Sequence, residues 1–330
     1  MKKANRLSLT VLASVALVLT IAVPGWAAMT LKAGHTLAPA HPYHLGLEKF
    51  GEIVKEKTGG EITLDVYHSS QLGSERELIE ALQMGTVDMT CISTAPLAGF
   101  TKSFMIYDLP FIFPDSATAH KVLDGEIGQK SLADLEKIGI IGLVFYENGF
   151  RQVTNSKRPL VKPTDARGLK IRTMENKIHM ASFRAVGANP VPMAFGEVFT
   201  ALQQGTIDAQ ENPLPIIFNN KYYEVQKYAS MTNHFYSPAP LLVSKKVWDK
   251  LTDEQKTIFK EAAVEARAYQ RAELAKQDAA YQNDLKEKGM EVNDVDHEAW
   301  LKAMAPVYKQ FEQEVGGAEL IKAVQDAGKK

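Results

Sequence analysis

Two spacings of apolar residues alternate along the chain. Residues 30–35 show the apolar and polar alternation of a strand, whereas in residues 42–57 apolar side chains recur every three to four positions, as on one face of a helix. The same patterns predict further strands at residues 61–67, 86–92, 140–146, 152–156, 169–173, 189–192, 228–232 and 241–244, and further helices at residues 75–84, 177–186, 252–288, 296–314 and 318–327. Such alternation of strands and helices is typical of the α/β class.

One segment of the chain occurs twice. The segment LIEALQMGTVDM at residues 78–89 reappears as VFTALQQGTIDA at residues 198–209, with six identities in twelve positions and a separation of 120 residues. Each copy has the pattern of a helix that ends at a glycine and is followed by a strand. A period this long does not fit a solenoid, so it predicts two similar lobes. Chance recurrence of a common helix-turn-strand motif is the alternative.

Residues 252–288 contain neither glycine nor proline and are rich in Ala, Glu, Lys and Gln. A capping box of Thr252 and Gln255 opens this segment, which as a single helix would be roughly 55 Å long, enough to brace both lobes. Two shorter helices are the alternative. We predict an α/β protein with two lobes and a hinge, the first lobe comprising residues 28–148 with 238–276 and the second residues 149–237 with 277–330.

The first 27 residues have the three parts of a secretory signal peptide. Three basic residues precede an apolar run at residues 7–22, and Gly25-Trp26-Ala27 fits a cleavage site. The apolar run is shorter than the roughly 20 residues that span a bilayer, although an N-terminal membrane anchor is the alternative. We therefore expect a periplasmic protein.

The charge and cysteine content narrow the possible partners. Of 38 basic and 39 acidic residues, the signal peptide holds three and none, so the mature charge is 35 − 39 = −4, and we expect no nucleic-acid partner. The single cysteine, Cys91, lies in an apolar run and is predicted to be a buried core residue.

Enzyme motifs are absent from the sequence. It contains no Walker phosphate loop, no G-x-G-x-x-G turn, no G-x-S-x-G elbow, no H-E-x-x-H helix and no C-x-x-C pair, so we expect neither catalysis nor a cofactor. The close spacing of His35, His41 and His44 leaves an exported metal-dependent enzyme as the competing class, although no acidic or cysteine ligand lies nearby in sequence.

Polar residues in loops after the predicted strands are the candidate ligand contacts, because α/β sheets bind ligands at the carboxyl ends of their strands. Arg151 and Arg172 lie beside strands, and an arginine fork matches a carboxylate with two parallel hydrogen bonds. The other candidates by position are His35, Gln71, Glu75, Ser93, Phe195 and Asn212, and Phe235 and Tyr236 are predicted to limit ligand size. The sequence therefore predicts a cleft for a small anion.

Five segments carry a resemblance to a known family: SSQLGSERELIEALQMGTVDM (69–89), NGFRQVTNSKRPL (148–160), GLKIR (168–172), GANPVPMAFGEVFTALQQGTIDAQENP (187–213) and YYEVQKYASMTNH (222–234). In order and spacing they resemble the substrate-binding proteins of tripartite ATP-independent periplasmic (TRAP) transporters. The resemblance covers nearly the whole mature chain.

The resemblance implies a two-lobed binding protein that closes on an organic acid and delivers it to a membrane permease pair driven by a cation gradient. It implies that Arg172 pairs with the ligand carboxylate, with Arg151 as second arginine, Asn212 as the asparagine before proline and Phe195 as the aromatic packed on the ligand. Ser93 stands where sialic-acid-binding members carry a glutamate, which argues against that ligand. We predict a monomer that binds a dicarboxylate or hydroxy acid, with a sugar acid or small sulfonate as the alternative.

Overall fold

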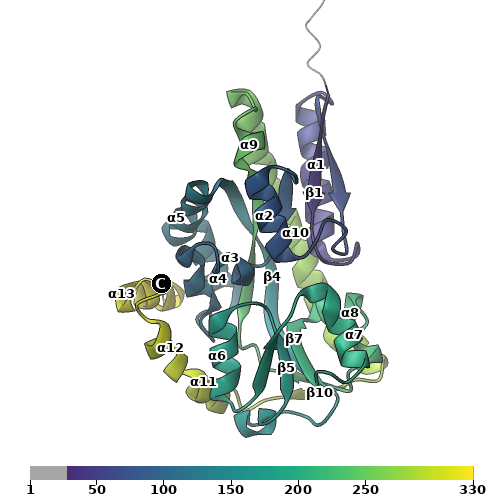
Figure 1. Ribbon diagram of the computed structural model, residues 1–330, viewed down its shortest axis with the longest axis vertical. Coiled ribbons are helices and arrows are strands. Elements are labelled where there is room, and N and C mark those ends of the chain that lie inside the picture. Colours follow the sequence, from purple (N-terminus) through teal and green to yellow (C-terminus); the bar gives the residue numbers. More distant parts are fainter. Residues whose placement is uncertain (1–27, 330) are drawn as a thin grey trace, which may run out of the picture.

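The computed structural model describes residues 28–329, and the predicted signal peptide lies outside them. One mixed sheet of ten strands runs through the molecule in the order β2-β1-β3-β9-β4-β7-β5-β6, with β8 paired to β4 and β10 paired to β8 (Figure 1). The strands are β1 (Met29–Gly34), β2 (Ile62–Tyr67), β3 (Met89–Cys91), β4 (Ile140–Asn155), β5 (Lys170–Thr173), β6 (Asn189–Pro192), β7 (Ala209–Pro213), β8 (Tyr228–Met231), β9 (Tyr236–Ser244) and β10 (Glu291–Asp294).

Helices cover the sheet in both halves of the molecule. They are α1 (Pro42–Lys57), α2 (Glu75–Met84), α3 (Thr94–Leu97), α4 (Ser116–Asp124), α5 (Glu126–Asp134), α6 (Lys177–Ala185), α7 (Val198–Gln203), α8 (Leu214–Asn219), α9 (Lys245–Trp248), α10 (Asp253–Glu287), α11 (His297–Met304), α12 (Pro306–Phe311) and α13 (Ala318–Asp326), and a 3-10 helix η1 spans Lys102–Asp108. The predicted helix at residues 296–314 is divided instead, because Pro306 lacks the N–H that a continuous helix needs.

The strands β4 and β9 join the two halves of the sheet. Residues 140–150 of β4 pair with β9, and residues 151–155 pair with β7 and β8. Pro238 and Pro240 fall between the strands predicted at residues 228–232 and 241–244, but in the structure they lie inside β9. The other neighbour of β9, β3, pairs only with residues 241–243, so the proline nitrogens can face the unpaired side. Two of the predicted lobe boundaries fall in these two shared strands and the third falls in α10, and all three stay a prediction.

The two copies of the repeat make the same contacts in the two halves. Gly85 and Gly205 both adopt left-handed backbone, with φ of 73° and 70°, after α2 and α7. Asp88 accepts a hydrogen bond from the backbone N of Lys32 on β1 at 2.7 Å, and Asp208 accepts one from the backbone N of Lys170 on β5 at 3.0 Å. The repeated aspartate therefore ties the end of its copy to the neighbouring parallel strand, β1 in one half and β5 in the other, which supports two similar lobes.

The segment after Thr252 is a single helix, α10, of 35 residues, so the alternative of two shorter helices is wrong. The predicted capping box is formed: Thr252 Oγ1 accepts from the Gln255 backbone N at 3.1 Å, and Gln255 Oε1 accepts from the Thr252 backbone N at 3.0 Å. Its buried face packs in one apolar cluster with residues of α1 from the first lobe and α8 from the second. The helix therefore braces both lobes, as predicted.

Cys91 is buried, with 1% of its surface exposed, and it forms no disulfide. Burial raises the pKa of this thiol well above its ordinary value. The prediction of a buried core residue is confirmed.

A carboxylate on α10 lies close to the strands that join the lobes. Gln270 of α10 holds β4 by donating to the Glu147 carbonyl at 2.6 Å and accepting from the Glu147 backbone N at 3.0 Å. Two turns further along α10, Asp278 Oδ1 is buried and has no hydrogen-bond partner among the described residues. Burial, with a smaller effect from the Glu147 carboxylate, raises the pKa of Asp278 from 3.8 to about 6.

Replacing Asp278 with asparagine is expected to stabilise the protein at neutral pH by about 2 kcal/mol. A raised carboxyl pKa favours the protonated form in the fold, so Asp278 contributes stability below its unfolded pKa of 3.8 that is lost as the pH rises through about 6. Urea unfolding at pH 7.5 and pH 5 measures the difference, which should shrink at pH 5. Exposed Glu265→Gln, on the same helix, is the control. The account is contradicted if Asp278→Asn raises the free energy of unfolding equally at both pH values, or if Glu265→Gln raises it by as much.

Candidate functional site

Arg172 on β5 is a buried cation with unused hydrogen-bonding capacity. Its side chain is 2% exposed, and Nε donates to the Met193 carbonyl at 2.9 Å. Its Nη1 is buried and has no partner within residues 28–329. Burial lowers the pKa of Arg172, although nearby Tyr222 and Glu211 oppose that effect. An anion placed at Nη1 would supply the missing partner.

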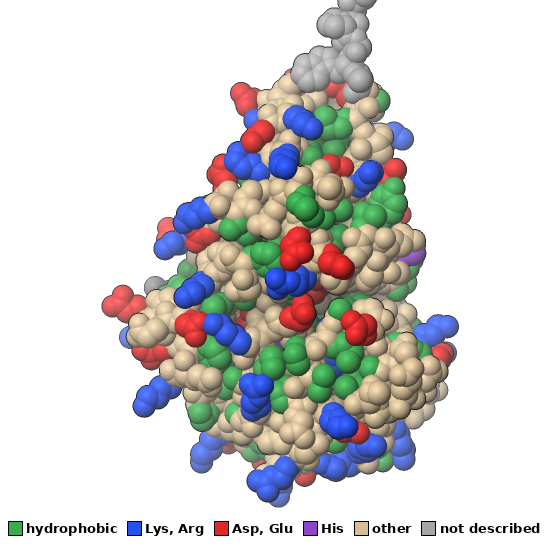
Figure 2. Space-filling view, in the orientation of Figure 1, with side chains coloured by type: hydrophobic (Ala, Val, Ile, Leu, Met, Phe, Trp, Pro, Cys, Tyr) green, Lys and Arg blue, Asp and Glu red, His purple; other side chains and the backbone are tan. Residues whose placement is uncertain are grey.

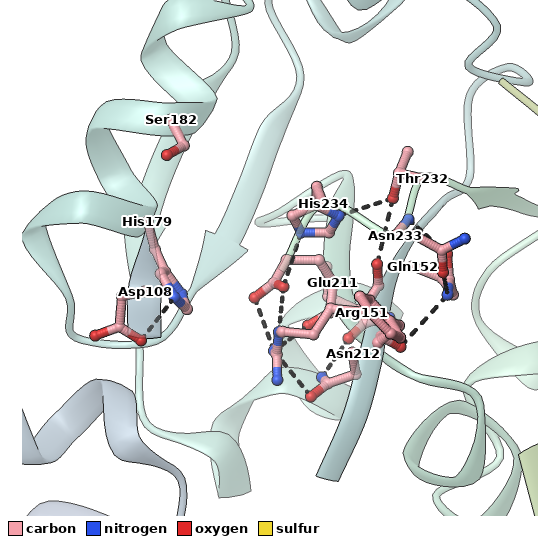
Figure 3. Close-up of polar contacts among 12 residues, drawn as sticks. Asp108, Arg151, Gln152, His179, Ser182, Glu211, Asn212, Thr232, Asn233 and His234 are labelled. Carbon is pink, nitrogen blue, oxygen red and sulfur yellow. Dashed lines mark hydrogen bonds and ion pairs between the residues drawn. The ribbon is translucent and has the colours of Figure 1, made fainter. Parts of the chain in front are cut away.

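Arg151, on β4, meets a carboxylate that the sequence analysis did not name. The antiparallel register of β4 and β7 places Val153 opposite Glu211, two residues from Arg151. Glu211 Oε2 accepts from Arg151 Nε, and Glu211 Oε1 accepts from Nη2 at 2.8 Å (Figure 3). Both side chains are at most 1% exposed. Arg151 is therefore held as a bidentate buried ion pair.

The ion pair continues into a polar network. Asn212 Oδ1 accepts from Arg151 Nη2 at 3.1 Å, and His234 Nε2 lies 3.1 Å from Glu211 Oε2 (Figure 3). Burial would raise the pKa of Glu211, but the Arg151 charge and the His234 contact outweigh it and hold that pKa far below its usual range. Arg151 Nη1, like Arg172 Nη1, is buried without a partner in the described part of the chain.

The first lobe contributes the opposite wall. Glu75 begins α2, and its Oε1 accepts from the Ser93 backbone N at 2.7 Å. A cavity of only about 20 Å³ between the lobes is lined by Glu75 and Pro96 from the first lobe and by Arg172, Met174 and Phe195 from the second. Figure 2 shows acidic side chains on both sides of the boundary between the upper and lower parts of the molecule.

Tyr43 and Tyr222 complete the surroundings of the arginines. Tyr43 Oη is buried with no hydrogen-bond partner among the described residues. Burial, then Cys91 and Glu75, raises the pKa of Tyr43, and the Ser93 side chain and then Arg151 oppose the rise. Burial also raises the pKa of Tyr222, against both arginines. Two guanidinium groups and a neutral phenol thus present unused donors in one buried region.

Most of the predicted contacts lie around this region. Arg151 donates to Asn212, and Glu75 accepts from the backbone of Ser93. Phe195 lines the cavity beside Arg172, and its ring centroid lies 6.5 Å from that of Tyr222. The sequence analysis missed Glu211 and Tyr43. Glu211 precedes Asn212 in the segment ENP, which was the one available signal, and nothing in the sequence singled out Tyr43.

Three residues predicted to contact the ligand have side chains that contact other residues instead: His35, Tyr236 and Phe235. His35 Nε2 lies 3.0 Å from His44 Nδ1, its Nδ1 accepts from the Leu37 backbone N at 3.2 Å, and burial, then His44, lowers its pKa to about 3. The Tyr236 hydroxyl donates to Glu147. The Phe235 ring stacks on His179 with centroids 4.0 Å apart. The structure does not bring these side chains to the two arginines.

Residues 33–314 match the model of the family described as bacterial extracellular solute-binding protein, family 7. The chain belongs to this family. Proteins of family 7 include the periplasmic binding subunits of TRAP transporters. The 2,3-diketo-L-gulonate-binding periplasmic protein YiaO of Escherichia coli is 39% identical over 91% of this chain and 92% of its own length.

Two further members of the family are similar over most of their length. The C4-dicarboxylate-binding periplasmic protein DctP of Rhodobacter capsulatus is 36% identical over 94% of this chain and 95% of its own. The crystal structure of a TRAP periplasmic solute-binding protein from Polaromonas sp. JS666, bound to D-erythronate, superposes with a TM-score of 0.88. It is 47% identical, and the match covers 90% of this chain and 98% of that one.

Membership in family 7 establishes solute binding as the function and two lobes as the fold, and it sets aside the metal-dependent enzyme. Among residues 28–329, no group of three His, Cys, Asp or Glu side chains is placed to hold a metal ion. The same residues contain no helix long and apolar enough to cross a membrane.

Proposed function

We propose that this binding protein captures a hydroxylated monocarboxylate, such as a small sugar acid, between its lobes in the periplasm. The observation that carries the proposal is the charge of the site. Glu211 already neutralises Arg151, whereas the nearest hydrogen-bond partner of Arg172 is the neutral Met193 carbonyl. Of the two arginines, Arg172 is therefore the one without a hydrogen-bonded carboxylate, and a single ligand carboxylate could pair with it.

Glu75 favours hydroxyl groups at the other end of the ligand. Its Oε1 is held by the Ser93 backbone N, and the residue lines the same cavity as Arg172. A carboxylate accepts hydrogen bonds from hydroxyl groups and repels a second carboxylate. D-erythronate, which the relative from Polaromonas binds, combines one carboxylate with several hydroxyls and so supports the proposal. The relative named for C4-dicarboxylates keeps a dicarboxylate as second candidate.

Titration calorimetry of the mature protein against D-erythronate, galactonate, succinate, malate and isethionate tests the proposed ligand class. We expect D-erythronate or galactonate to bind at least about tenfold more tightly than succinate, the equivalent of one hydrogen bond to a charged group. Succinate or isethionate as the tightest ligand would overturn it.

The variant Glu75→Gln is expected to reduce the preference for hydroxylated monocarboxylates over dicarboxylates. It removes the negative charge that repels a second carboxylate and weakens the acceptor for hydroxyls, so succinate should gain and D-erythronate lose about tenfold in affinity. Calorimetry of the same panel measures both changes. Glu80→Gln, on the same helix but outside the cavity lining, is the control and should change neither affinity.

We further infer that the protein acts as a monomer and hands its ligand to the membrane permease of a TRAP transporter. Family membership supports this role. Light scattering of the mature protein, with and without ligand, should give the mass of one chain. Uptake of the bound acid into proteoliposomes containing the cognate permease should require this protein.

A further inference from the structure

We propose that Asn176 and Asp108 form a latch between the lobes that sets how long a captured anion stays bound. The proposal rests on the proposed function of ligand capture in this cleft. Asn176 belongs to the second lobe, where it precedes α6, the helix that connects β5 to β6. Asp108 ends η1, which follows β3 and α3 of the first lobe.

The side-chain amide of Asn176 makes hydrogen bonds in both lobes: its oxygen bonds within the second lobe and its nitrogen bonds to the first. Its Oδ1 caps α6 by accepting from the backbone N of Ile178 at 2.9 Å and of His179 at 3.1 Å. Its Nδ2 crosses to the first lobe and donates to the Ala95 carbonyl at 3.0 Å and to Asp108 Oδ2 at 2.7 Å. The donor end is thus used entirely across the lobe boundary, while the acceptor end fixes the helix that carries it.

The Asp108 carboxylate, in the first lobe, likewise has its side-chain partner in the second lobe. It is 3% exposed, and within residues 28–329 its carboxylate accepts a hydrogen bond from Asn176 Nδ2 at 2.7 Å. His179 Nε2, on α6, lies 3.4 Å from Oδ1 without forming a hydrogen bond (Figure 3). A buried carboxylate without partners is costly, so Asp108 needs either these second-lobe groups or water. Contact between the lobes is what replaces the water.

The latch is coupled to the ligand through a short rigid segment. Asn176 follows Arg172, the proposed carboxylate clamp, by four residues, and β5 is paired on both sides, with β6 and with β7. A ligand that draws Arg172 toward the first lobe also brings Asn176 onto Ala95 and Asp108. Because this pair forms only when the two lobes are in contact, it gives the arrangement with that contact a differential stability, which a population shift requires.

The variant Asn176→Ser tests the latch while keeping the helix cap. Serine is a good N-cap, but its side chain is too short to provide the Nδ2 contacts across the boundary. We expect D-erythronate to dissociate about tenfold faster in stopped-flow measurements, with little change in the association rate. We also expect a larger radius of gyration in solution X-ray scattering at subsaturating ligand. Exposed Asn189→Ser is the matched control and should behave as wild type.

Asp108→Asn separates the latch from a merely structural role. It keeps an oxygen that accepts from Asn176, so its dissociation rate should lie between those of wild type and Asn176→Ser. In the double variant Asn176→Ser with Asp108→Asn, the two increases in dissociation rate should not add, because both substitutions act on one contact. Additive effects, or an Asn176→Ser dissociation rate equal to wild type, would overturn the latch and leave the proposed function standing.

The latch and the proposed function can fail separately. If wild type binds no acid of the panel, the proposed function fails, and the latch is judged by scattering of the ligand-free proteins. There Asn176→Ser must give a larger radius of gyration than both wild type and Asn189→Ser, and equal values would refute it.

Discussion

Arg172→Ala is expected to weaken ligand binding by about 2 to 5 kcal/mol, as for one partner of a buried charge pair. The guanidinium of Arg172 is buried, donates through Nε to the Met193 carbonyl, and has an unpartnered Nη1. Removing it leaves a ligand carboxylate in a buried cleft without its counter-ion. Calorimetry with D-erythronate measures the loss.

The same variant should not destabilise the ligand-free protein. Burial opposes the charge of Arg172, as its lowered pKa indicates, and no carboxylate among the described residues is hydrogen-bonded to it. The free energy of unfolding from urea titration should therefore stay within about 1 kcal/mol of wild type. Arg167→Ala, an exposed arginine on the same segment, is the control for affinity. Unchanged affinity in Arg172→Ala would refute its assigned role without touching the fold.

Glu211→Ala should instead lower the free energy of unfolding by about 3 to 5 kcal/mol, because it leaves Arg151 buried and uncompensated. Arg151 is 0% exposed, and Glu211 supplies both of its charge-paired contacts. Urea unfolding measures the loss. Exposed Glu224→Ala, in the same lobe, should change stability by less than about 0.5 kcal/mol.

A double variant distinguishes the ion pair from the individual side chains. Replacing Arg151 by methionine and Glu211 by leucine removes both charges while keeping much of the volume, so most of the lost stability should return. The ligand affinity of the double variant should be lower than that of wild type, because Arg151 Nη1 is then missing from the cleft. A double variant as unstable as Glu211→Ala would show that the packing of these side chains, and not their charge, holds this region.

Much of the architecture could be predicted because its signals are local. The repeated Gly85 and Gly205 permit the left-handed backbone that ends a helix, and the apolar residues around them predicted a helix followed by a strand in each copy. The capping box at Thr252 and the absence of glycine and proline after it predicted one long helix. Where a local signal was misread, as for Pro238 and Pro240, the pairing of neighbouring strands decided the outcome.

The candidate site also has a part that the sequence predicted and a part that it did not. Arg151, Arg172 and Asn212 were expected in loops after strands but lie within β4, β5 and β7, and Glu75 begins α2. Their positions beside predicted strands and helices were enough to single them out. Whether each arginine is free or paired is a different question. Glu211 is 60 residues from Arg151, and the two meet because the register of β4 and β7 brings them together. A shift of one residue would turn Glu211 to the opposite face of the sheet.

The sequence by itself determined the α/β class, the two lobes, the long brace and the presence of arginines suited to an anion. The tertiary structure decided which charges are paired: Arg151 is paired with Glu211, Arg172 has no hydrogen-bonded carboxylate among the described residues, and Asp108 accepts from Asn176. The reason is physical. Periodicity, caps and turns are properties of neighbouring residues, whereas the net charge of a buried site depends on residues that only the packing of separate strands and lobes brings within hydrogen-bonding distance.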